Sequence, residues 1–203
     1  MGKGWILGYG KSELYKTYVD GNYCCLLQAE IIVKNKIKVG STFNQDEFLK
    51  IREESDELTC KTLGLNYISN GPKTRKQVFD HLKQKGYLII SINKALDTLC
   101  EYGYISDKYY AEMFVKSKQE QKGKMYLKNA LKQKGVSDSI INEVLENFES
   151  DEDCIMLLAN KFLKNKKDDG KLKEKLYRHL LGKGFEYGEV IKVCNKIFKE
   201  GID

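Results

Sequence analysis

The chain has 203 residues, 41% of them hydrophobic and 32% charged, which is typical of a globular protein and excludes a disordered chain. The net charge of +6 arises after residue 70, because residues 1–70 carry equal numbers of basic and acidic side chains. This surplus suits contact with a polyanion or with an acidic protein surface. No segment is apolar enough for a signal peptide or a membrane span, and the six cysteines lack the CxxC spacing of zinc and redox sites. We therefore expect a cytoplasmic protein with reduced thiols.

The first 54 residues are predicted to form a small element of their own. Residues 14–19, LYKTYV, alternate as a half-buried strand does, and Asp20-Gly21 before YCCLL predicts a hairpin turn. AEIIVKNK then predicts a short helix. Asn44 and Glu47 have capping-box spacing and open a further helix through about residue 54. Residues 1–54 are thus predicted to be a β-hairpin plus helix, and no strand is expected after them.

The remaining chain contains a six-residue motif that occurs three times. HLKQKG at 81–86 returns as ALKQKG at 130–135 and, more loosely, as HLLGKG at 179–184, so that glycines recur every 49 residues. A lysine in the last turn of a helix faces the negative end of the helix dipole, and a following glycine adopts the left-handed cap conformation easily. The motif therefore predicts the end of a helix at each of its three occurrences.

Apolar residues repeat with the same period. Four columns have the i, i+3, i+4, i+7 spacing of one helix face: Ile92, Ile141 and Val190; Ala95, Val144 and Val193; Leu96, Leu145 and Cys194; Leu99, Phe148 and Ile197. Each period has room for about three helices. We predict a mainly α protein in which three tandem three-helix repeats, at 55–104, 105–149 and 150–203, form an elongated curved solenoid.

Several motifs that suggest a nucleotide, metal or catalytic site lack the spacing that such a site requires. GYGKS at 8–12 resembles the end of a phosphate-binding loop, but the first glycine of that motif falls on Trp5, and no strand is expected before it. We interpret this stretch as a flexible N-terminus. His81 and His179 share a repeat column and are expected to be half-exposed surface residues and not metal ligands. The acidic clusters at 151–153 and 168–169 suit helix starts and a solvated loop. No nucleophile has a base at motif spacing, so we expect no catalysis, no cofactor and no metal.

Basic residues also form columns with the 49-residue period. These columns are Arg75, Lys124 and Lys173, and Lys85, Lys134 and Lys183, to which the middle repeat adds Lys116, Lys118, Lys122, Lys128 and Lys132. A stripe of such cations binds phosphates without regard to sequence, although lysines also simply solvate helix faces. Two roles are open for four tyrosines, which either stack on bases or belong to the core: Tyr109, Tyr110, Tyr126 and Tyr177.

The pattern resembles the RecX family, the regulatory proteins of the RecA recombinase, over about residues 55–200. The resemblance is most specific in GYISDKYYAEMFV followed by a basic residue, KGK and LKQKGV, and it continues in YRHLLGKGFEYGEVIKVCNKIF. The chain departs from the family pattern in having Lys118 where members often have arginine, and Ser106-Asp107 where they have two acidic residues.

The resemblance implies three tandem three-helix repeats, no catalytic activity, and binding in the helical groove of RecA on single-stranded DNA. Relatives limit filament growth and so restrain ATP hydrolysis, strand exchange and repressor self-cleavage in the SOS response. We expect a monomer that binds no membrane, with single- or double-stranded DNA as a further partner. The residues expected to contact RecA or DNA are Arg75, Lys76, Lys118, Lys122, Lys124, Lys128, Lys173 and Arg178. Two alternatives are a helical nucleic-acid-binding module and a protein-interaction scaffold, both unrelated to RecA.

Overall fold

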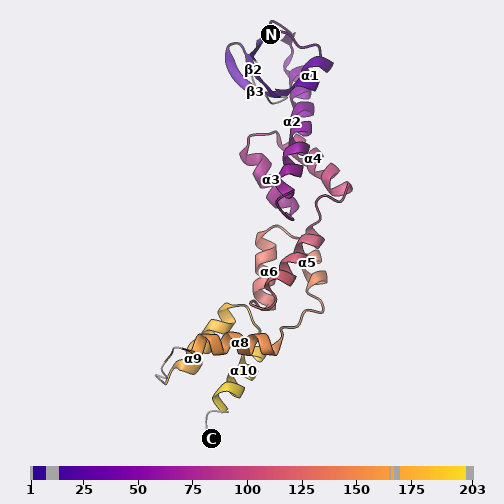
Figure 1. The fold of residues 1–203 in the computed structure, drawn as a ribbon. Coiled ribbons are helices and arrows are strands. Elements are labelled where there is room, and N and C mark those ends of the chain that lie inside the picture. Colours follow the sequence, from indigo (N-terminus) through magenta and orange to yellow (C-terminus); the bar gives the residue numbers. More distant parts are fainter. Residues whose placement is uncertain (1, 8–13, 165, 167–169, 200–203) are drawn as a thin grey trace. The chain divides into compact units, whose positions relative to one another are not determined.

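A computed structural model describes residues 2–7, 14–164, 166 and 170–199 of the chain (Figure 1). Helices predominate, and the chain divides into two compact units, Met1–Ser106 and Asp107–Asp203. This confirms the predicted mainly α class with a small β element at the start. Within the described residues, no helix is both long and apolar enough to cross a bilayer.

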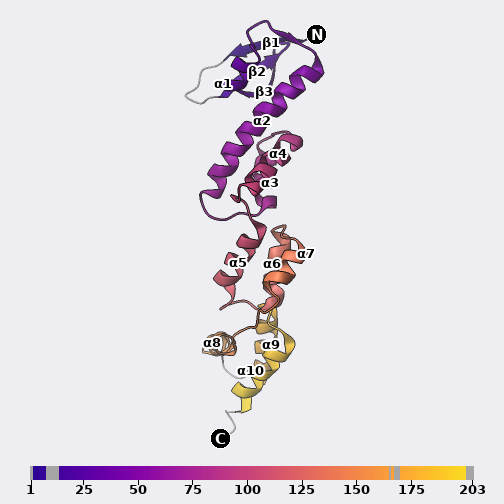
Figure 2. The ribbon, with the colours of Figure 1, turned by 90° about the vertical axis from the view of Figure 1, so that its right-hand side faces the viewer.

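The first unit begins with an antiparallel sheet in the strand order β3-β2-β1-β4 (Figure 2). Its strands are β1 (Gly2–Leu7), β2 (Leu14–Val19), β3 (Asn22–Gln28) and β4 (Thr42–Phe43). The predicted hairpin is confirmed as β2–β3, with positive φ angles of 49° and 82° at Asp20 and Gly21 in its turn. The buried side chain of Leu27 anchors β3 to the core of this element.

The prediction of a flexible N-terminus with no strand before GYGKS is wrong for residues 2–7. These residues form β1, which pairs with β2 from Gly4 opposite Val19 to Leu7 opposite Lys16, and with β4 at its start. The glycine-rich sequence has a weak strand signal of its own, and the pairing to the second edge of β2 supplies the hydrogen bonds that define the strand. GYGKS itself, at 8–12, lies outside the described residues.

The helix predicted to end near residue 54 is much longer. After α1 (Ala29–Lys34), α2 runs from Gln45 to Ile68 and begins with the predicted capping box, in which Asn44 and Glu47 bond each other's backbone N–H groups at 2.8 and 3.1 Å. From Glu53 onward it contacts α3 and α4. Buried polar residues there obscure the apolar periodicity, since the Ser55 hydroxyl accepts a hydrogen bond from the Gln28 N–H at 2.8 Å.

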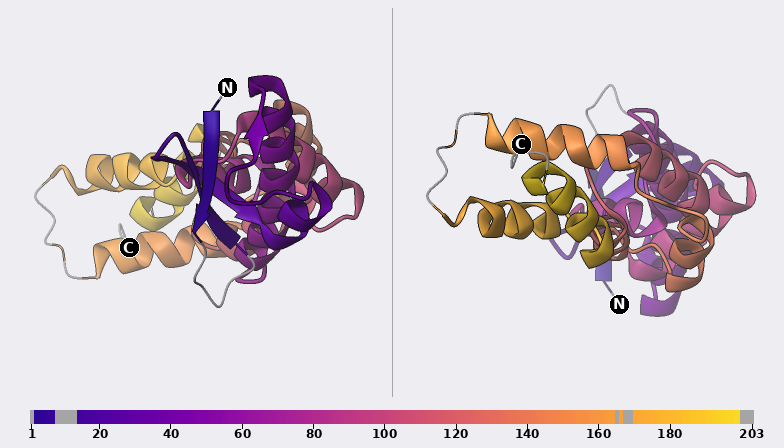
Figure 3. Two further views of the ribbon diagram at one scale, coloured as in Figure 1. Left: turned by 90° about the horizontal axis from the view of Figure 1, so that it is seen from above. Right: turned by 90° about the horizontal axis from the view of Figure 1, so that it is seen from below.

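The other helices form three-helix groups. With the end of α2, α3 (Arg75–Gln84) and α4 (Ile89–Glu101) enclose one core. A second core lies among α5 (Asp107–Lys118), α6 (Lys124–Gln133) and α7 (Asp138–Val144). A third lies among α8 (Glu152–Leu163), α9 (Leu172–Gly182) and α10 (Tyr187–Lys199), which Figure 3 shows packed together. No strand follows β4 in the parts of the chain that the structure describes.

The repeat columns confirm the predicted helix ends. Gly86, Gly135 and Gly184 have φ angles of 86°, 84° and 87°, so each takes the left-handed position after its helix. The predicted apolar helix face is only partly right in the middle repeat. α7 ends at Val144, whereas the predicted face continues to Leu145 and Phe148. Leu145 is nevertheless buried, since tighter backbone bonds, such as Phe148 N–H to Leu145 C=O at 3.3 Å, carry the chain around one further turn.

Asp56, which is 3% exposed, provides a stability test for the first unit. One carboxylate oxygen accepts the N–H of Leu88 at 3.1 Å, directly before α4. Replacement of Asp56 by Leu is expected to cost about 1–3 kcal/mol of unfolding free energy, because it leaves that partly buried N–H without its acceptor. Asp56→Asn keeps an acceptor and is expected to lose much less. Urea unfolding followed by circular dichroism measures the difference, and equal losses would contradict it.

The charge of Asp56 also makes the stability of the first unit depend on pH. Desolvation raises the pKa of Asp56 above its usual 3.8, against the lowering effects of the Leu88 N–H and Arg52. The folded state therefore binds a proton more readily than the unfolded state, so stability falls as the pH rises from 3.8 through the raised folded value. Asp56→Asn is expected to lack this decline, and unfolding of both proteins across that pH range checks it.

Candidate interaction surface

The eight predicted contact residues are distributed over both units. Arg75 and Lys76 begin α3 in the first unit, and the other six belong to the second unit. Lys118 ends α5, Lys122 lies in the connection to α6, and Lys124 and Lys128 lie in α6. Lys173 and Arg178 lie in α9. The structure therefore brings Lys118, Lys122 and Lys124 around one connection, with Lys128 one turn further along α6, and leaves the other four on α3 and α9.

Two of these residues also hold their own three-helix group together. Arg75 forms an ion pair with Asp97 of α4 at 2.8 Å, and the equivalent Lys173 donates to Asn195 of α10 at 3.2 Å. Asp97 and Asn195 are two repeat periods apart, so the same bridge recurs between the second and third helices of both groups. Sequence reasoning missed this structural role, although the shared column of Asp97 and Asn195 was a signal for it.

Lys76 and Arg178 each form an ion pair with a carboxylate of their own helix. Lys76 contacts Asp80 at 2.8 Å, and Arg178 contacts Glu174, each four residues away. Ion pairs at such exposed positions contribute roughly 0–1 kcal/mol, so an external anion can displace the carboxylate at small cost. Lys118 and Lys128 are exposed and form no ion pair within the described part of the chain. All four remain available to a partner.

The start of α6 is bonded to the end of α9. The Gly123 N–H donates to the Lys183 carbonyl and the Met125 N–H to the Gly184 carbonyl, both at 3.1 Å. A Cβ on Gly123 would lie 2.3 Å from the Gly184 oxygen, so only glycine permits this approach. We call residues 123–126 with 183–185 the α6–α9 juncture. Sequence reasoning identified Lys183-Gly184 only as a helix end, because nothing local indicates what that end contacts.

Positive charge gathers at the α6–α9 juncture. Desolvation lowers the pKa of Lys183, and the nearby Lys122 and Lys161 lower it further. The Lys122 ammonium lies 4.1 Å from the centre of the Tyr126 ring, a favourable cation–π distance. Lys161 was not among the residues expected to make contacts, since it is distant in sequence from Lys122 and Lys183.

His179 belongs to the same neighbourhood. Its ring stacks on Phe162 with 4.3 Å between centroids, so the side chain is partly buried as expected for a surface histidine, but it also has a packing role. Its repeat equivalent, His81, stacks on Tyr67 at 4.1 Å. Among the described residues there is no cluster of three or more His, Cys, Asp or Glu side chains that could hold a metal ion.

The ionisation of His179 tests the charge at the juncture. Its pKa lies below the usual value because of desolvation first, and then because Lys183, Lys166 and Lys122 repel its proton. Lys122→Gln removes one of these positive charges and is expected to raise the pKa of His179. Titration of the imidazole signals by NMR measures this shift, with Lys50→Gln in α2 as the control. An unchanged pKa in Lys122→Gln would contradict the proximity of these groups.

A groove adjoins the juncture. It has a volume of about 270 Å³ and is lined by two stretches of chain. From α6 come Met125, Tyr126, Asn129, Ala130 and Gln133, and from the end of α9 come Leu181, Gly182 and Gly184. Met125 and Tyr126 are 50% and 36% exposed, so the groove presents apolar and aromatic surface next to two side-chain amides.

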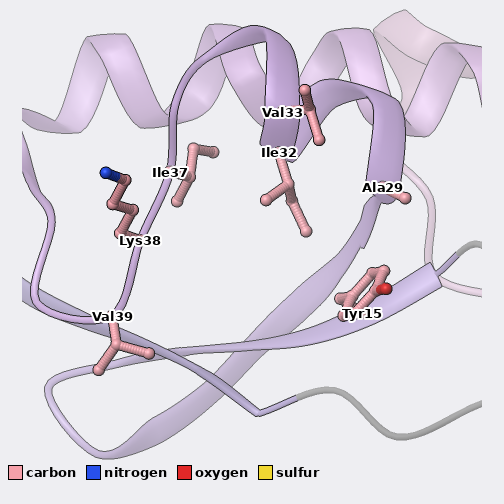
Figure 4. Close-up of a pocket in the computed structure, with 7 residues that line it drawn as sticks. All are labelled: Tyr15, Ala29, Ile32, Val33, Ile37, Lys38 and Val39. Carbon is pink, nitrogen blue, oxygen red and sulfur yellow. The ribbon is translucent and has the colours of Figure 1, made fainter.

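A second hollow, of about 300 Å³, lies in the N-terminal element (Figure 4). Its lining is mostly apolar and comprises Tyr15, Ala29, Ile32, Val33, Ile37, Lys38 and Val39. Lys38 is the sole charged residue of that lining, and no acid–base pair or nucleophile faces the hollow. The chemistry of the hollow is therefore that of an apolar contact surface and not that of a reaction centre.

Comparisons with known proteins agree on one family. Residues 106–145 match the family model of the second three-helix domain of RecX, and residues 149–194 match that of the third. A protein of Clostridium tetani named regulatory protein RecX is 33% identical over 186 residues, which cover 89% of this chain and 86% of the relative. A protein of the same name from Clostridium botulinum is 36% identical over 197 residues, 94% of this chain and 91% of the relative.

Two solved structures resemble the chain. The first, described as a crystal structure of regulatory protein RecX, has a TM-score of 0.66 at 20% identity and covers 95% of this chain and 98% of its own. The second, a crystal structure of RecX from Lactobacillus salivarius, has a TM-score of 0.62 at 26% identity over 70% of this chain and 96% of its own. The first shows likeness of fold alone.

Proposed function

This chain belongs to the RecX family, and from that premise we propose that it regulates the RecA recombinase by binding RecA assembled on single-stranded DNA. The observation that carries the proposal is the similarity to relatives named regulatory protein RecX over nine-tenths of the chain. Binding in the filament would limit filament growth. It would thereby restrain RecA's ATP hydrolysis, strand exchange and promotion of repressor self-cleavage in the SOS response.

The proposed regulator performs no bond chemistry. Two of its six thiols are consistent with this, since burial raises the pKa of Cys25 and Cys60 to about 12. A thiol that stays protonated at neutral pH is a poor nucleophile. Regulation then depends on binding, and the surface supplies cations for it. We propose that contacts to RecA or DNA are made by Arg75, Lys76, Lys118, Lys122, Lys124, Lys128, Lys173 and Arg178.

We further propose the functional division into residues 1–54, 55–104, 105–149 and 150–203. The separate hydrophobic cores support it, since one lies in the N-terminal element and one in each three-helix group. Each group would then present its own cations to the filament. A monomer in the cytoplasm, where RecA works, is the form we propose for this task.

Titration of the protein into the single-stranded-DNA-dependent ATPase of the host RecA tests the proposal. At fixed salt, we expect a marked fall in ATP hydrolysis at substoichiometric amounts of the protein, because one regulator bound to a filament affects many RecA subunits. RecA assembled on excess DNA controls for simple competition for the strand. An ATPase rate that stays constant up to equimolar protein would refute the proposed function.

A further inference from the structure

Two lysines, Lys122 and Lys183, flank the backbone bonds of the α6–α9 juncture, and a third, Lys161, adds to the positive charge at Lys183. Lys122 precedes α6, Lys161 lies near the end of α8, and Lys183 follows α9, and the first two act on the ammonium group of the third. We call them the juncture lysines. Among the described residues, none of the three forms an ion pair with a carboxylate. Like charges held together without a counter-ion repel one another, and an anion between them relieves that repulsion.

The fold positions the backbone at two of the juncture lysines before any ligand arrives. Lys122 and Lys183 are fixed by the backbone bonds of Gly123 and Met125 to the end of α9. The Lys122 ammonium is further oriented over the ring of Tyr126. A site ordered in advance loses less conformational entropy on binding, so a ligand gains more from it.

The groove beside the juncture lysines suits a flat ring with polar edges. Tyr126 and Met125 offer exposed aromatic and thioether surface, while Asn129 and Gln133 offer amide donors and acceptors. A nucleobase requires both features, a surface on which to stack and groups that bond its edge. An acidic peptide requires neither, and carboxylates are recognised best by the bidentate fork of arginine, which the juncture lysines lack.

We propose that the juncture lysines and the adjoining groove bind a segment of single-stranded nucleic acid. The ammonium groups of Lys122, Lys161 and Lys183 contact successive phosphates, and one base enters the groove against Tyr126 and Met125. The inference deepens the proposed function and rests on it for the choice of partner, because a regulator of RecA acts beside single-stranded DNA. The site itself joins two three-helix groups, so neither group provides it alone.

The test is direct binding of the full chain to fluorescein-labelled (dT)15, measured by fluorescence anisotropy at several salt concentrations. The triple variant Lys122→Gln, Lys161→Gln, Lys183→Gln is expected to bind about tenfold more weakly or worse. Its plot of log K against log salt is expected to be less steep by about 2, since each lost phosphate contact removes about 0.7. The matched control is Lys16→Gln, Lys38→Gln, Lys50→Gln, which makes the same charge change in the N-terminal element. Equal affinity and slope in both variants would overturn the inference.

A folding check separates loss of the site from loss of the protein. Because the juncture lysines repel one another, the triple variant is expected to melt at the same temperature as wild type or a higher one. Circular dichroism melting curves measure this. A cooperative melting curve in the triple variant shows that its loss of (dT)15 binding reflects loss of the site and not loss of the fold.

Two further probes test the groove and the class of ligand. Wild type is expected to prefer (dT)15 to an abasic strand of equal length, and Tyr126→Ala is expected to remove that preference. Absence of the preference in wild type would overturn the base-binding part. Poly-glutamate is expected to compete poorly with (dT)15, whereas competition equal to that of unlabelled (dT)15 would favour an acidic protein and overturn the inference.

The RecA assay separates this inference from the proposed function. Protein that binds (dT)15 through the juncture lysines but leaves RecA ATPase unchanged would refute only the proposed function. Protein that inhibits RecA while the triple substitution leaves (dT)15 binding intact would refute only the inference.

Discussion

Gly184→Ala is expected to open the α6–α9 juncture and to destabilise the second unit by more than about 3 kcal/mol, the range of the most damaging single substitutions. Two effects combine at this position. Its φ angle of 87° is unfavourable for any residue with a Cβ, and the new Cβ would lie 2.3 Å from the backbone nitrogen of Tyr126. The α9 end must therefore move away from α6, and both 3.1 Å backbone bonds are lost. Hydrogen exchange at the amides of Gly123 and Met125 measures this loss.

Two matched variants separate the causes. Gly86→Ala changes the same repeat column at nearly the same φ angle, 86°, but the new Cβ meets no atom within 4 Å. It is expected to cost only the backbone term, about 1–2 kcal/mol. Gly123→Ala has an ordinary φ of −79° but the same 2.3 Å clash, so it isolates the steric term. If Gly184→Ala cost no more than Gly86→Ala, the juncture would not be a tight backbone contact.

Reversing the charge of Lys118, Lys124 and Lys128 to Glu is expected to raise by at least about tenfold the protein concentration that half-inhibits RecA ATPase. Each exposed contact contributes about 0.5–1 kcal/mol, and a combined loss of 1.4 kcal/mol corresponds to a factor of ten. The fold should survive, because the unfavourable glutamate at the end of α5 (Lys118) is offset by the favourable one in the first turn of α6 (Lys124), and each dipole effect is only about 0.3–1 kcal/mol. The variant leaves the juncture lysines intact, so it reports on the proposed RecA contacts separately.

The control for this reversal is Lys16→Glu, Lys38→Glu, Lys50→Glu, which alters the net charge equally at exposed positions of the N-terminal element. It is expected to inhibit RecA as wild type does, with unchanged helicity by circular dichroism. Equal weakening in both triple variants would mean that net charge alone governs the effect. No weakening in either would remove Lys118, Lys124 and Lys128 from the contact surface.

Local signals in the sequence were sufficient for several elements. The capping box of Asn44 and Glu47, the turn at Asp20-Gly21 and the left-handed glycine after α3, α6 and α9 are each decided within a few residues. Such features depend on backbone conformation and on side chains close in sequence, so a single chain reveals them. The three-helix groups followed as well, because a 49-residue period copies the same buried face three times.

Where local signals were weak, distant partners decided the structure. β1 exists because β2 and β4 supply hydrogen-bond partners to a glycine-rich segment. The full length of α2 depends on burial of Ser55 and Asp56 against β3 and α4, which makes polar residues part of a core. A periodicity analysis of hydrophobic residues passes over such positions.

By itself the sequence determined the helical class, the repeat, the helix ends and the family, because these follow from propensity, spacing and shared motifs. Only the tertiary structure showed that Arg75 and Lys173 bridge helices within their groups and that the segment of Lys122 lies against the end of α9 at Lys183, where Lys161 also adds positive charge. The physical reason is that charge acts through space. Side chains tens of residues apart influence one another once a glycine contact such as Gly123 against Gly184 brings two helix ends together, and no linear pattern records that contact.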